Sequence, residues 1–433
     1  MNNGQKLWKR AKKIIPNGNM LLSKNSDSFL PNFWPSYFKK TKGCYVWCLD
    51  NKKYLDMSIM GIGTNILGYS NDYIDKAVIK VVQNGNLSTL NAPEEVFLAE
   101  KILELNPWAA MVKFTRSGGE ANAVAIRIAR AATNKQEIAI CGYHGWHDWY
   151  LSANLKNKNN LDDHLFPNVM IKGVNSRLKN TVHPFKYNDI ESLTSILEKN
   201  KKIGIIKMEV MRNEFPKDNF LKKIEKIAIK NKLILIFDEC TTGFRETDFG
   251  LHKKYNVTPD IAIFGKALGN GYAINSIIGK KDIMREAEQT FISSTFWSER
   301  IGYVAGLKTL ELMQKEKSWE KITYIGKKIQ KNIKLLAKEN NIPVTVSGLP
   351  SLTSIKFKYN NLGCKTFLTQ EMLKKGILAS NLIYVCTKHD NRMLEKYFDN
   401  LNEIFKSIRN YDYGNDIDVL LNGPVCRPGM RKS

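Results

Sequence analysis

The sequence predicts an α/β fold with a mostly parallel sheet, because short apolar runs alternate with amphipathic segments of helical spacing. Residues 233–237 and 261–264 are unbroken apolar runs of the kind that forms strands buried on both faces. Residues 219–230 have the period of a helix and precede the first of these runs, as in a strand–helix–strand unit. The first run ends at Asp238 and the second leads into Lys266.

Asp238 and Lys266 are the first indication of function. Ligands of open α/β sheets bind outside the carboxyl ends of the strands, so both side chains can reach one ligand. A surface ion pair is the simpler alternative, but the apolar runs before both residues favour burial. A lysine in a dry site can react as the neutral amine and form a Schiff base. A buried aspartate needs a cationic partner, and a protonated pyridine nitrogen would serve. The pair therefore predicts pyridoxal phosphate (PLP) as cofactor.

Three motifs around these residues resemble the class III PLP-dependent aminotransferases, and glutamate-1-semialdehyde aminomutases most of all. They are Asp-Glu-Cys-Thr-Thr-Gly-Phe-Arg at 238–245, Thr-Pro-Asp-Ile at 258–261 and Gly-Lys-Ala-Leu-Gly-Asn-Gly at 265–271. The resemblance extends from about residue 38 to residue 408. It implies the fold type I of PLP-dependent transferases, with a large PLP-binding domain and a smaller α/β domain. It also implies two catalytic residues: Lys266 holds PLP, and Asp238 faces the pyridine nitrogen.

A phosphate site is predicted where small residues precede the helical segment 122–132. Backbone N–H groups at such a helix start are free to bind an anion. The stretch Ser117-Gly118-Gly119 resembles the phosphate cup of the family, in which the two residues after the serine hold the phosphate. Many relatives carry a hydroxyl at the place of Gly119, so we expect the backbone to hold more of the phosphate here.

Tyr143 and His144 follow another apolar run, at 138–141. The resemblance places Tyr143 on one face of the pyridine ring, His144 in the same cofactor site and Cys240 on the opposite face of the ring. A metal site on the two histidines of this turn is disfavoured, because no third ligand has suitable spacing.

Glu209 ends a further apolar run, at 203–208, and is also predicted at the cofactor site. Two interpretations stay open: the carboxylate lies near the cofactor, or it only caps the sheet. The family usually has proline after this glutamate, whereas Val210 follows here.

Thr295 precedes a phenylalanine, and a threonine in such a pair binds the cofactor phosphate of the neighbouring subunit in the resembling family. The resemblance therefore implies a homodimer with shared active sites. The family usually continues with small residues and Gly-Asn-Pro, but this chain has Trp297-Ser298-Glu299-Arg300. This departure predicts a substrate other than glutamate semialdehyde.

The predicted domains are an N-terminal segment that joins the small domain (1–70), a large PLP-binding domain (71–310), a C-terminal small domain (311–410) and a tail (411–433). The tail has weak periodicity and is either disordered or laid across the dimer surface. We expect an antiparallel edge strand at 274–278 and a mobile surface loop at 155–168.

Composition limits the other function classes. The net charge of +24 invites a nucleic-acid partner, but the lysines are scattered in pairs and no nucleic-acid-binding motif is present. No apolar stretch approaches the ~18 residues that a membrane helix needs. The seven cysteines are an odd number without a CxxC pair, which is typical of free thiols in the cytoplasm. We therefore expect a cytoplasmic protein with neither nucleic-acid nor membrane partners.

The predicted function is an aminotransferase that moves an amino group from a donor such as glutamate to an aldehyde or ketone, with sugars among the candidate acceptors. The alternative is a glutamate-1-semialdehyde 2,1-aminomutase of tetrapyrrole biosynthesis, which would return the amino group to the same carbon skeleton. A basic binding protein on a degenerate PLP fold is a third possibility. The presence of both Lys266 and Asp238 weakens it.

Overall fold

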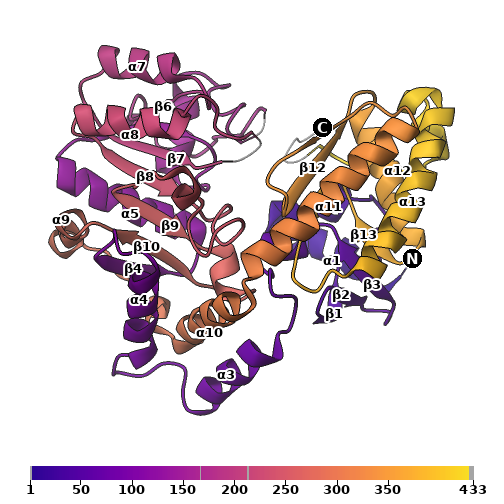
Figure 1. Cartoon of the computed structure of the whole chain (residues 1–433), viewed down its shortest axis with the longest axis horizontal. Coiled ribbons are helices and arrows are strands. Elements are labelled where there is room, and N and C mark those ends of the chain that lie inside the picture. Colours follow the sequence, from indigo (N-terminus) through magenta and orange to yellow (C-terminus); the bar gives the residue numbers. More distant parts are fainter. Residues whose placement is uncertain (1, 166, 212–213, 429–433) are drawn as a thin grey trace. The chain divides into compact units, whose positions relative to one another are not determined.

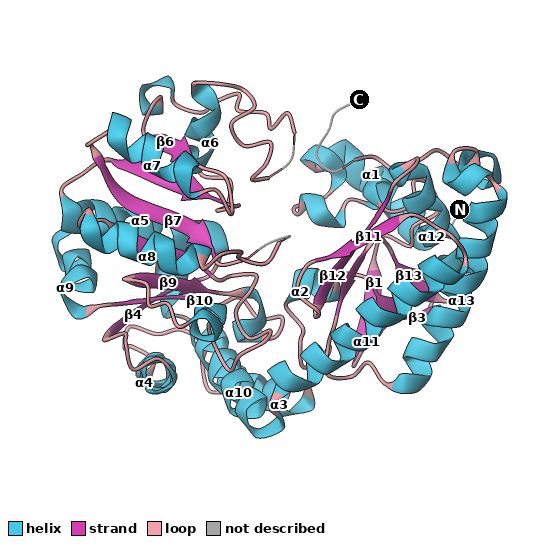
Figure 2. Ribbon diagram, turned by 45° about the horizontal axis from the view of Figure 1, so that its top comes forward, coloured by secondary structure: helices cyan, strands magenta, loops and turns pink. Residues whose placement is uncertain are grey.

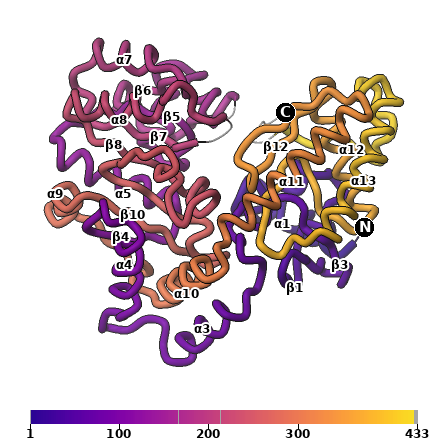
Figure 3. The backbone as a smooth tube through the Cα atoms, in the orientation of Figure 1, coloured from indigo at the N-terminus to yellow at the C-terminus, as the bar shows by residue number. Residues whose placement is uncertain are grey.

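The computed structural model describes residues 2–165, 167–211 and 214–428, which form two compact units (Figure 1). Unit 1 contains the described parts of Met1–Asn71 and Glu320–Ser433, and unit 2 those of Asp72–Trp319. Unit 1 is thus built from both ends of the chain. In Figure 3 its indigo N-terminal segment lies among the orange and yellow C-terminal segments.

Unit 2 contains a seven-stranded sheet in the order β4-β10-β9-β8-β7-β5-β6 (Figure 2). Its strands are β4 (Met111–Thr115), β5 (Glu137–Cys141), β6 (Val182–Pro184), β7 (Ile203–Glu209), β8 (Ile234–Asp238), β9 (Ile261–Phe264) and β10 (Asn275–Gly279). The neighbours from β9 to β6 are parallel. Glu209 pairs with Asp238, so the ends of β7 and β8 place two carboxylates side by side.

The prediction of an edge strand at 274–278 was wrong in one respect. Strand β10 is antiparallel, as expected, but it lies between β4 and β9 and pairs with both. All five of its residues are buried. This burial fits an inner position, because an edge strand would leave one row of backbone groups without a partner.

The helices of unit 2 lie around the sheet and against one another (Figure 2). They are α3 (Asp72–Gln83), α4 (Pro93–Leu105), α5 (Gly118–Thr133), α6 (Asp148–Leu151), α7 (Ile190–Lys199), α8 (Phe220–Lys230), α9 (Lys281–Met284) and α10 (Arg300–Glu316). The alanine-rich face of α5 packs against aliphatic side chains of β5, β7, β8, β9 and β10 in one buried cluster. Burying each large aliphatic side chain contributes roughly 1.5–3 kcal/mol. This cluster therefore fixes where the start of α5 meets the carboxyl ends of the strands.

The segment 155–168 was predicted as a mobile surface loop, and the structure corrects this for its described residues. Leu161 is fully buried and His164 is 5% exposed. His164 accepts a hydrogen bond at Nδ1 from the N–H of Gly142 over 3.0 Å. The loop therefore supports the turn that carries Tyr143.

Unit 1 contains two small sheets. The strands β1 (Phe38–Lys42), β2 (Tyr45–Cys48) and β3 (Lys53–Met57) form an antiparallel meander, which β13 (Ile377–Ala379) extends in parallel to β3. The strands β11 (Val344–Ser347), β12 (Leu352–Phe357) and β14 (Leu382–Tyr384) form an antiparallel sheet. The helices are α1 (Asn3–Ile14), α2 (Met60–Gly63), α12 (Asn361–Lys374), α13 (Asn391–Asn410) and α11 (Ser318–Glu339), which begins two residues before the unit boundary. Over the described residues, no helix combines the length and the apolar character that crossing a membrane requires.

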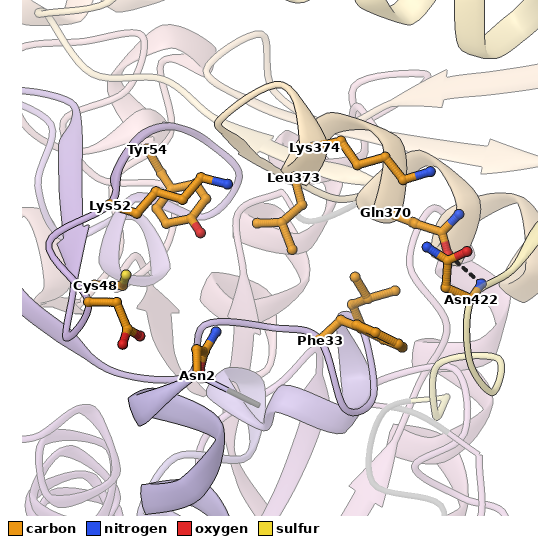
Figure 4. Close-up of a pocket in the computed structure, with 11 residues that line it drawn as sticks. Asn2, Phe33, Cys48, Lys52, Tyr54, Gln370, Leu373, Lys374 and Asn422 are labelled. Atoms are coloured by element: carbon orange, nitrogen blue, oxygen red, sulfur yellow. Dashed lines mark hydrogen bonds between the residues drawn. The ribbon is translucent and has the colours of Figure 1, made fainter.

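The tail is ordered as far as residue 428 and packs on α12 of its own unit, so the prediction of a disordered tail was wrong for these residues. Gln370 of α12 accepts from the N–H of Asn422 over 2.7 Å and donates to the carbonyl of Leu420 over 3.0 Å (Figure 4). Thr366 accepts from the N–H of Cys426 over 2.9 Å. The tail is therefore held by hydrogen bonds from α12 side chains to its backbone, and not by the apolar face of a regular helix or strand.

We predict that Gln370→Ala releases the tail, because two backbone groups lose their partner. The expected loss is about 1–3 kcal/mol in the free energy of unfolding, measured by urea denaturation. Limited proteolysis should then cleave the variant within residues 420–428. Gln330→Ala is the control, because Gln330 of α11 binds the carbonyl of Gly348 instead. Equal cleavage of the tail in both variants would contradict the prediction.

Candidate functional site

All ten residues predicted for the site lie in unit 2, at or near the carboxyl end of the sheet. They are Ser117, Gly118, Gly119, Tyr143, His144, Glu209, Asp238, Cys240, Lys266 and Thr295. A cavity of about 310 Å³ in unit 1 is lined by none of them (Figure 4). The chemistry predicted from the sequence therefore gathers in unit 2.

The start of α5 leaves two backbone donors free for an anion. Ser117 is the N-cap, and its hydroxyl accepts from the N–H of Glu120 over 3.4 Å. Glu120 in turn accepts from the N–H of Ser117 over 2.8 Å, which completes a capping box. Gly118 and Gly119 are the first two residues of the helix, so their N–H groups have no acceptor within it. The Ser117 side chain itself is occupied by capping.

Four elements converge just beyond these donors. A Cβ atom on Gly118 would lie 3.6 Å from the Cys240 sulfur and 3.9 Å from the Asn275 amide oxygen. A Cβ atom on Gly265, the residue before Lys266, would lie 3.5 Å from the same sulfur. The starts of α5 and β10 and the residues after β8 and β9 therefore enclose one small space. At Gly265 the Asn275 side chain already fills this space, because a Cβ atom there would clash with the Asn275 amide oxygen.

Asp238 is buried at the end of β8 and is held by a buried histidine. The Nδ1 atom of His144 lies 2.9 Å from the Asp238 carboxylate, and the N–H of Cys240 donates to the other carboxylate oxygen over 3.1 Å. Burial raises the pKa of Asp238, but the Lys207 ammonium and the His144 contact lower it more, so it lies well below its usual value. Burial and the Lys207 charge lower the pKa of His144 to about 4. The pair is therefore an ionised aspartate beside a neutral histidine, whose Nδ1–H donates.

Lys266 follows β9 and is half-buried, with its backbone in the left-handed region (φ +43°). Its ammonium donates to the Thr241 hydroxyl over 2.7 Å. Thr241 stands three residues after Asp238, so this contact joins the loops that follow β8 and β9. The lysine charge also acts on the thiol of Cys240. The structure thus brings Lys266, Asp238 and Cys240 to one region, as the strand ends predicted.

Glu209 supports the turn that carries Tyr143. Its carboxylate accepts from the N–H of Tyr143 over 2.9 Å. A Cβ atom on Gly142 would lie 2.6 Å from the same carboxylate, and Gly142 has φ +107°, so glycine is required there. Of the two interpretations of Glu209, these contacts support a structural role at the end of the sheet. The Tyr143 side chain remains 37% exposed.

The ring of His147 occupies the space beside Gly119. A Cβ atom on Gly119 would lie 2.7 Å from the imidazole, so a residue with a side chain would displace the ring. The ring is also stacked on Trp146, with 4.5 Å between their centroids. This contact gives a physical reason for the glycine at a position where many relatives carry a hydroxyl.

Thr295 begins a short 3₁₀ turn (Thr295–Ser298), and its side chain is exposed. The segment after it is tied to Arg116, the residue before Ser117. The Arg116 guanidinium donates to the carbonyls of Trp297 and Glu299 over 2.9 and 2.7 Å. The unusual segment 297–300 is thus anchored next to the start of α5.

Three contacting residues were missed from the sequence. Asn275 is buried at the start of β10, Thr241 binds Lys266, and Arg116 anchors the segment after Thr295. Thr241 lies inside the motif at 238–245, so its position next to Asp238 was a usable signal. Arg116 directly precedes Ser117, so its position was a usable signal too. Asn275 had none, because only the pairing of β10 with β4 brings it to the site.

A model of the family "Aminotransferase class-III" matches residues 31–399. The chain belongs to the class III aminotransferases. Two similar proteins align with this chain over almost their whole length. A 3-aminobutyryl-CoA aminotransferase of Cloacimonas acidaminovorans is 31% identical over 418 residues, 93% of this chain and 96% of that protein. A glutamate-1-semialdehyde 2,1-aminomutase of Wigglesworthia glossinidia brevipalpis is 31% identical over 433 residues, with 94% and 98% covered.

Solved structures share the fold. The PLP internal aldimine form of the FumI protein from Sphingopyxis sp. MTA144 superposes with a TM-score of 0.86 at 20% identity, over 97% of this chain and 100% of that one. An omega-transaminase from Sphaerobacter thermophilus gives a TM-score of 0.83 at 21% identity, over 94% and 98%. The fold is therefore that of the PLP-dependent transferases of fold type I, as predicted.

PLP is the cofactor of this aminotransferase, and the residues present fit it. An ionised, buried Asp238 suits a pyridinium nitrogen, and the two free N–H groups of α5 suit a phosphate. The Cys240 sulfur lies beside the same helix start, 3.6 Å from where a Cβ atom on Gly118 would stand. Lys266 supplies the amine within the same group of loops.

We predict that His144 makes the apoprotein less stable in mild acid. Its pKa is about 4 when folded and about 6.5 when unfolded, so only the unfolded chain gains a proton between these values. Stability is complete above pH 6.5 and falls as the pH is lowered. The loss from this residue should be about 2 kcal/mol between pH 7 and pH 5, measured by urea denaturation.

The variant His144→Asn keeps a donor for Asp238 and does not titrate, so it should lose about 2 kcal/mol less than the wild type between the same two pH values. His183→Asn is the matched control, because His183 lies on the edge strand β6 and contacts Glu137 instead of Asp238. A pH dependence in His144→Asn as steep as that of the control would contradict the prediction.

Proposed function

We propose that this class III aminotransferase is a cytoplasmic homodimer that moves an amino group from a donor such as glutamate to an aldehyde or ketone, with sugars among the acceptors. One observation carries the proposal. The amine of Lys266, the buried carboxylate of Asp238 and the free N–H groups of α5 meet at the carboxyl end of one sheet. The cytoplasm is supported by the cysteines, because all seven lie within the described residues and are free thiols.

Two residues act on protons and charge in this proposal. PLP supplies an acceptor for the electron pair left when a substrate carbon loses its proton. Lys266 would hold the cofactor through its amine and, once that amine is freed, would move the proton that the substrate α carbon loses. Asp238 keeps the pyridine nitrogen protonated. Neutral His144 donates to Asp238, which keeps the carboxylate ionised and oriented.

Other residues bind and orient. The N–H groups of Gly118 and Gly119 would hold the phosphate from one subunit, and Thr295 would reach it from the neighbouring subunit. Tyr143 and Cys240 would flank the pyridine ring. Two features support this arrangement: Thr295 is exposed, and the Cys240 sulfur lies beside the space in front of Gly118.

The choice of aminotransferase over aminomutase rests on the segment 297–300. Arg300 forms an ion pair with Glu94 at 2.6 Å, and the N–H of Arg300 binds the carbonyl of Asn86, so the unusual residues are built firmly into unit 2. A site that departs from the usual family sequence here supports a different substrate. Similarity to an enzyme named 3-aminobutyryl-CoA aminotransferase also supports transfer between two substrates.

The second candidate is a glutamate-1-semialdehyde 2,1-aminomutase. Seven of the similar proteins carry that name, at 28–33% identity. A mutase would convert glutamate-1-semialdehyde to its amino-shifted isomer without a second substrate. An aminotransferase would convert a donor to its keto acid and leave the amino group on the enzyme.

A single-turnover experiment separates these functions. The PLP form is mixed with glutamate and other amines, and the released carbonyl product is quantified against enzyme. The aminated enzyme is then mixed with a panel of aldehydes and ketones that includes keto sugars. One equivalent of product in each half-reaction supports the aminotransferase. Isomerisation of glutamate-1-semialdehyde, with no half-reaction on other amines, would favour the mutase.

We predict that Lys266→Ala abolishes turnover and leaves the fold intact, because β9 before it is unchanged. Borohydride should attach PLP covalently to the wild type and not to the variant, as measured by mass spectrometry. Lys280→Ala is the control, because Lys280 also follows a strand of this sheet but pairs with Asp260 at its surface. A covalent PLP adduct at the wild-type level in Lys266→Ala would overturn the assignment.

We predict that Thr295 contributes to the active site of the neighbouring subunit. Thr295→Ala should weaken PLP retention, because a charge-assisted hydrogen bond contributes roughly 1.5–3 kcal/mol. In heterodimers of Lys266→Ala and Thr295→Ala subunits, one site carries both changes and the other carries neither. Tight PLP binding should therefore return at half of the sites, as measured by dialysis against a PLP trap.

The mixing experiment needs two controls. Thr295→Ala homodimers set the weak-binding level, and heterodimers of Lys266→Ala with Ser294→Ala set the tight-binding level. Ser294 is also exposed and precedes Thr295. If verified heterodimers recover no tight site, Thr295 acts only within its own chain and the shared site is discarded.

A further inference from the structure

Lys207 is a buried lysine that the mechanism above does not use. It lies near the end of β7 and is fully buried. Its ammonium has no hydrogen-bond partner among the described residues. Burial lowers the pKa of Lys207 to about 8, so it still carries a proton at neutral pH. A buried cation without a partner destabilises the fold, and this cost needs an explanation.

The register of the sheet shows where this ammonium lies. Lys207 stands in one row with Ile140 of β5 and Ile236 of β8. Both isoleucines belong to the cluster that packs against α5, so Lys207 lies on the same face of the sheet. Two residues further towards the carboxyl end, the next row on the same face contains Glu209 and Asp238. The ammonium therefore lies in the core directly below the two carboxylates.

The groups around Lys207 leave one negative charge to be neutralised. The titratable groups that face it are Asp238 on β8, Glu209 on its own strand, His144 after β5 and Cys240 after β8. The buried residues of α5 include no charged side chain. His144 is neutral, and burial raises the pKa of the Cys240 thiol. Two carboxylates and the Lys207 ammonium then sum to a single negative charge. The Lys266 ammonium of the neighbouring loop can balance it until PLP binds that amine.

We propose that Lys207 is a positioning residue of the cofactor site, which acts through Asp238 and sets the proton affinity of the bound pyridine nitrogen. This inference rests on the proposed role of Asp238. Without Lys207 the row of carboxylates would carry two uncompensated charges and bind the ring proton more tightly. With Lys207 one charge remains for the ring nitrogen, and Asp238 stays ionised when the cofactor is absent.

The test is a pH titration of the holoenzyme without substrate. PLP labelled with ¹⁵N in its ring is bound to the wild type and to Lys207→Met, which is similar in length and apolar. The midpoint pH at which the ring nitrogen loses its proton is measured from the ¹⁵N chemical shift and from the cofactor absorbance. It should rise by about one pH unit in Lys207→Met, because a nearby cation is removed.

Three further variants make the result specific. Lys113→Met is the matched control, because Lys113 lies on β4 of the same sheet and burial lowers its pKa as well. Lys207→Gln repeats the neutralisation with a polar side chain should the methionine variant not fold. In Asp238→Asn/Lys207→Met the effect of Lys207 should be largely lost relative to Asp238→Asn, because the carboxylate through which it acts is absent.

The outcomes separate this inference from the function it rests on. Equal midpoints in the wild type, Lys207→Met and Lys113→Met would overturn the role of Lys207 and leave the proposed function standing. Failure of the wild type to bind PLP would instead contradict the proposed function.

Discussion

The pairing of two buried carboxylates, Asp238 and Glu209, is the constraint on which the site depends. Carboxylates side by side in a dry sheet repel each other and need donors and positive charge nearby. The turn after β5 supplies two of these donors, the N–H of Tyr143 and Nδ1–H of His144. The position of that turn, and with it the aromatic ring of Tyr143, follows from the need to satisfy both acids.

The strands and their end residues could be predicted from the sequence because parallel strands bury both faces. The run 233–237 became β8 and the run 261–264 became β9, with Asp238 and Lys266 at or just after their ends. The inner position of β10 could not be predicted in this way. It depends on β4, a distant segment whose pairing leaves no local pattern in either sequence.

Side-chain contacts between loops could not be predicted from the sequence either. From the sequence, Gly119 was interpreted only as a position that lacks the hydroxyl of many relatives. The structure shows that the His147 imidazole occupies the place of a side chain there. Lys207 lay inside an apolar run and was counted as part of a strand, because periodicity says nothing about a single charge in a buried row. The family motifs located the residues of the site, but only packing shows which of them touch.

The construction of unit 1 from both chain ends has a consequence for biosynthesis. Strand β3 pairs with β13, which the ribosome produces only after all of unit 2. Unit 2 is continuous in sequence and can complete its sheet while the N-terminal segment waits with the pairing edge of β3 uncovered. An uncovered edge is prone to pair with other chains. The nascent chain therefore passes through a stage in which unit 2 is complete while unit 1 still lacks β13.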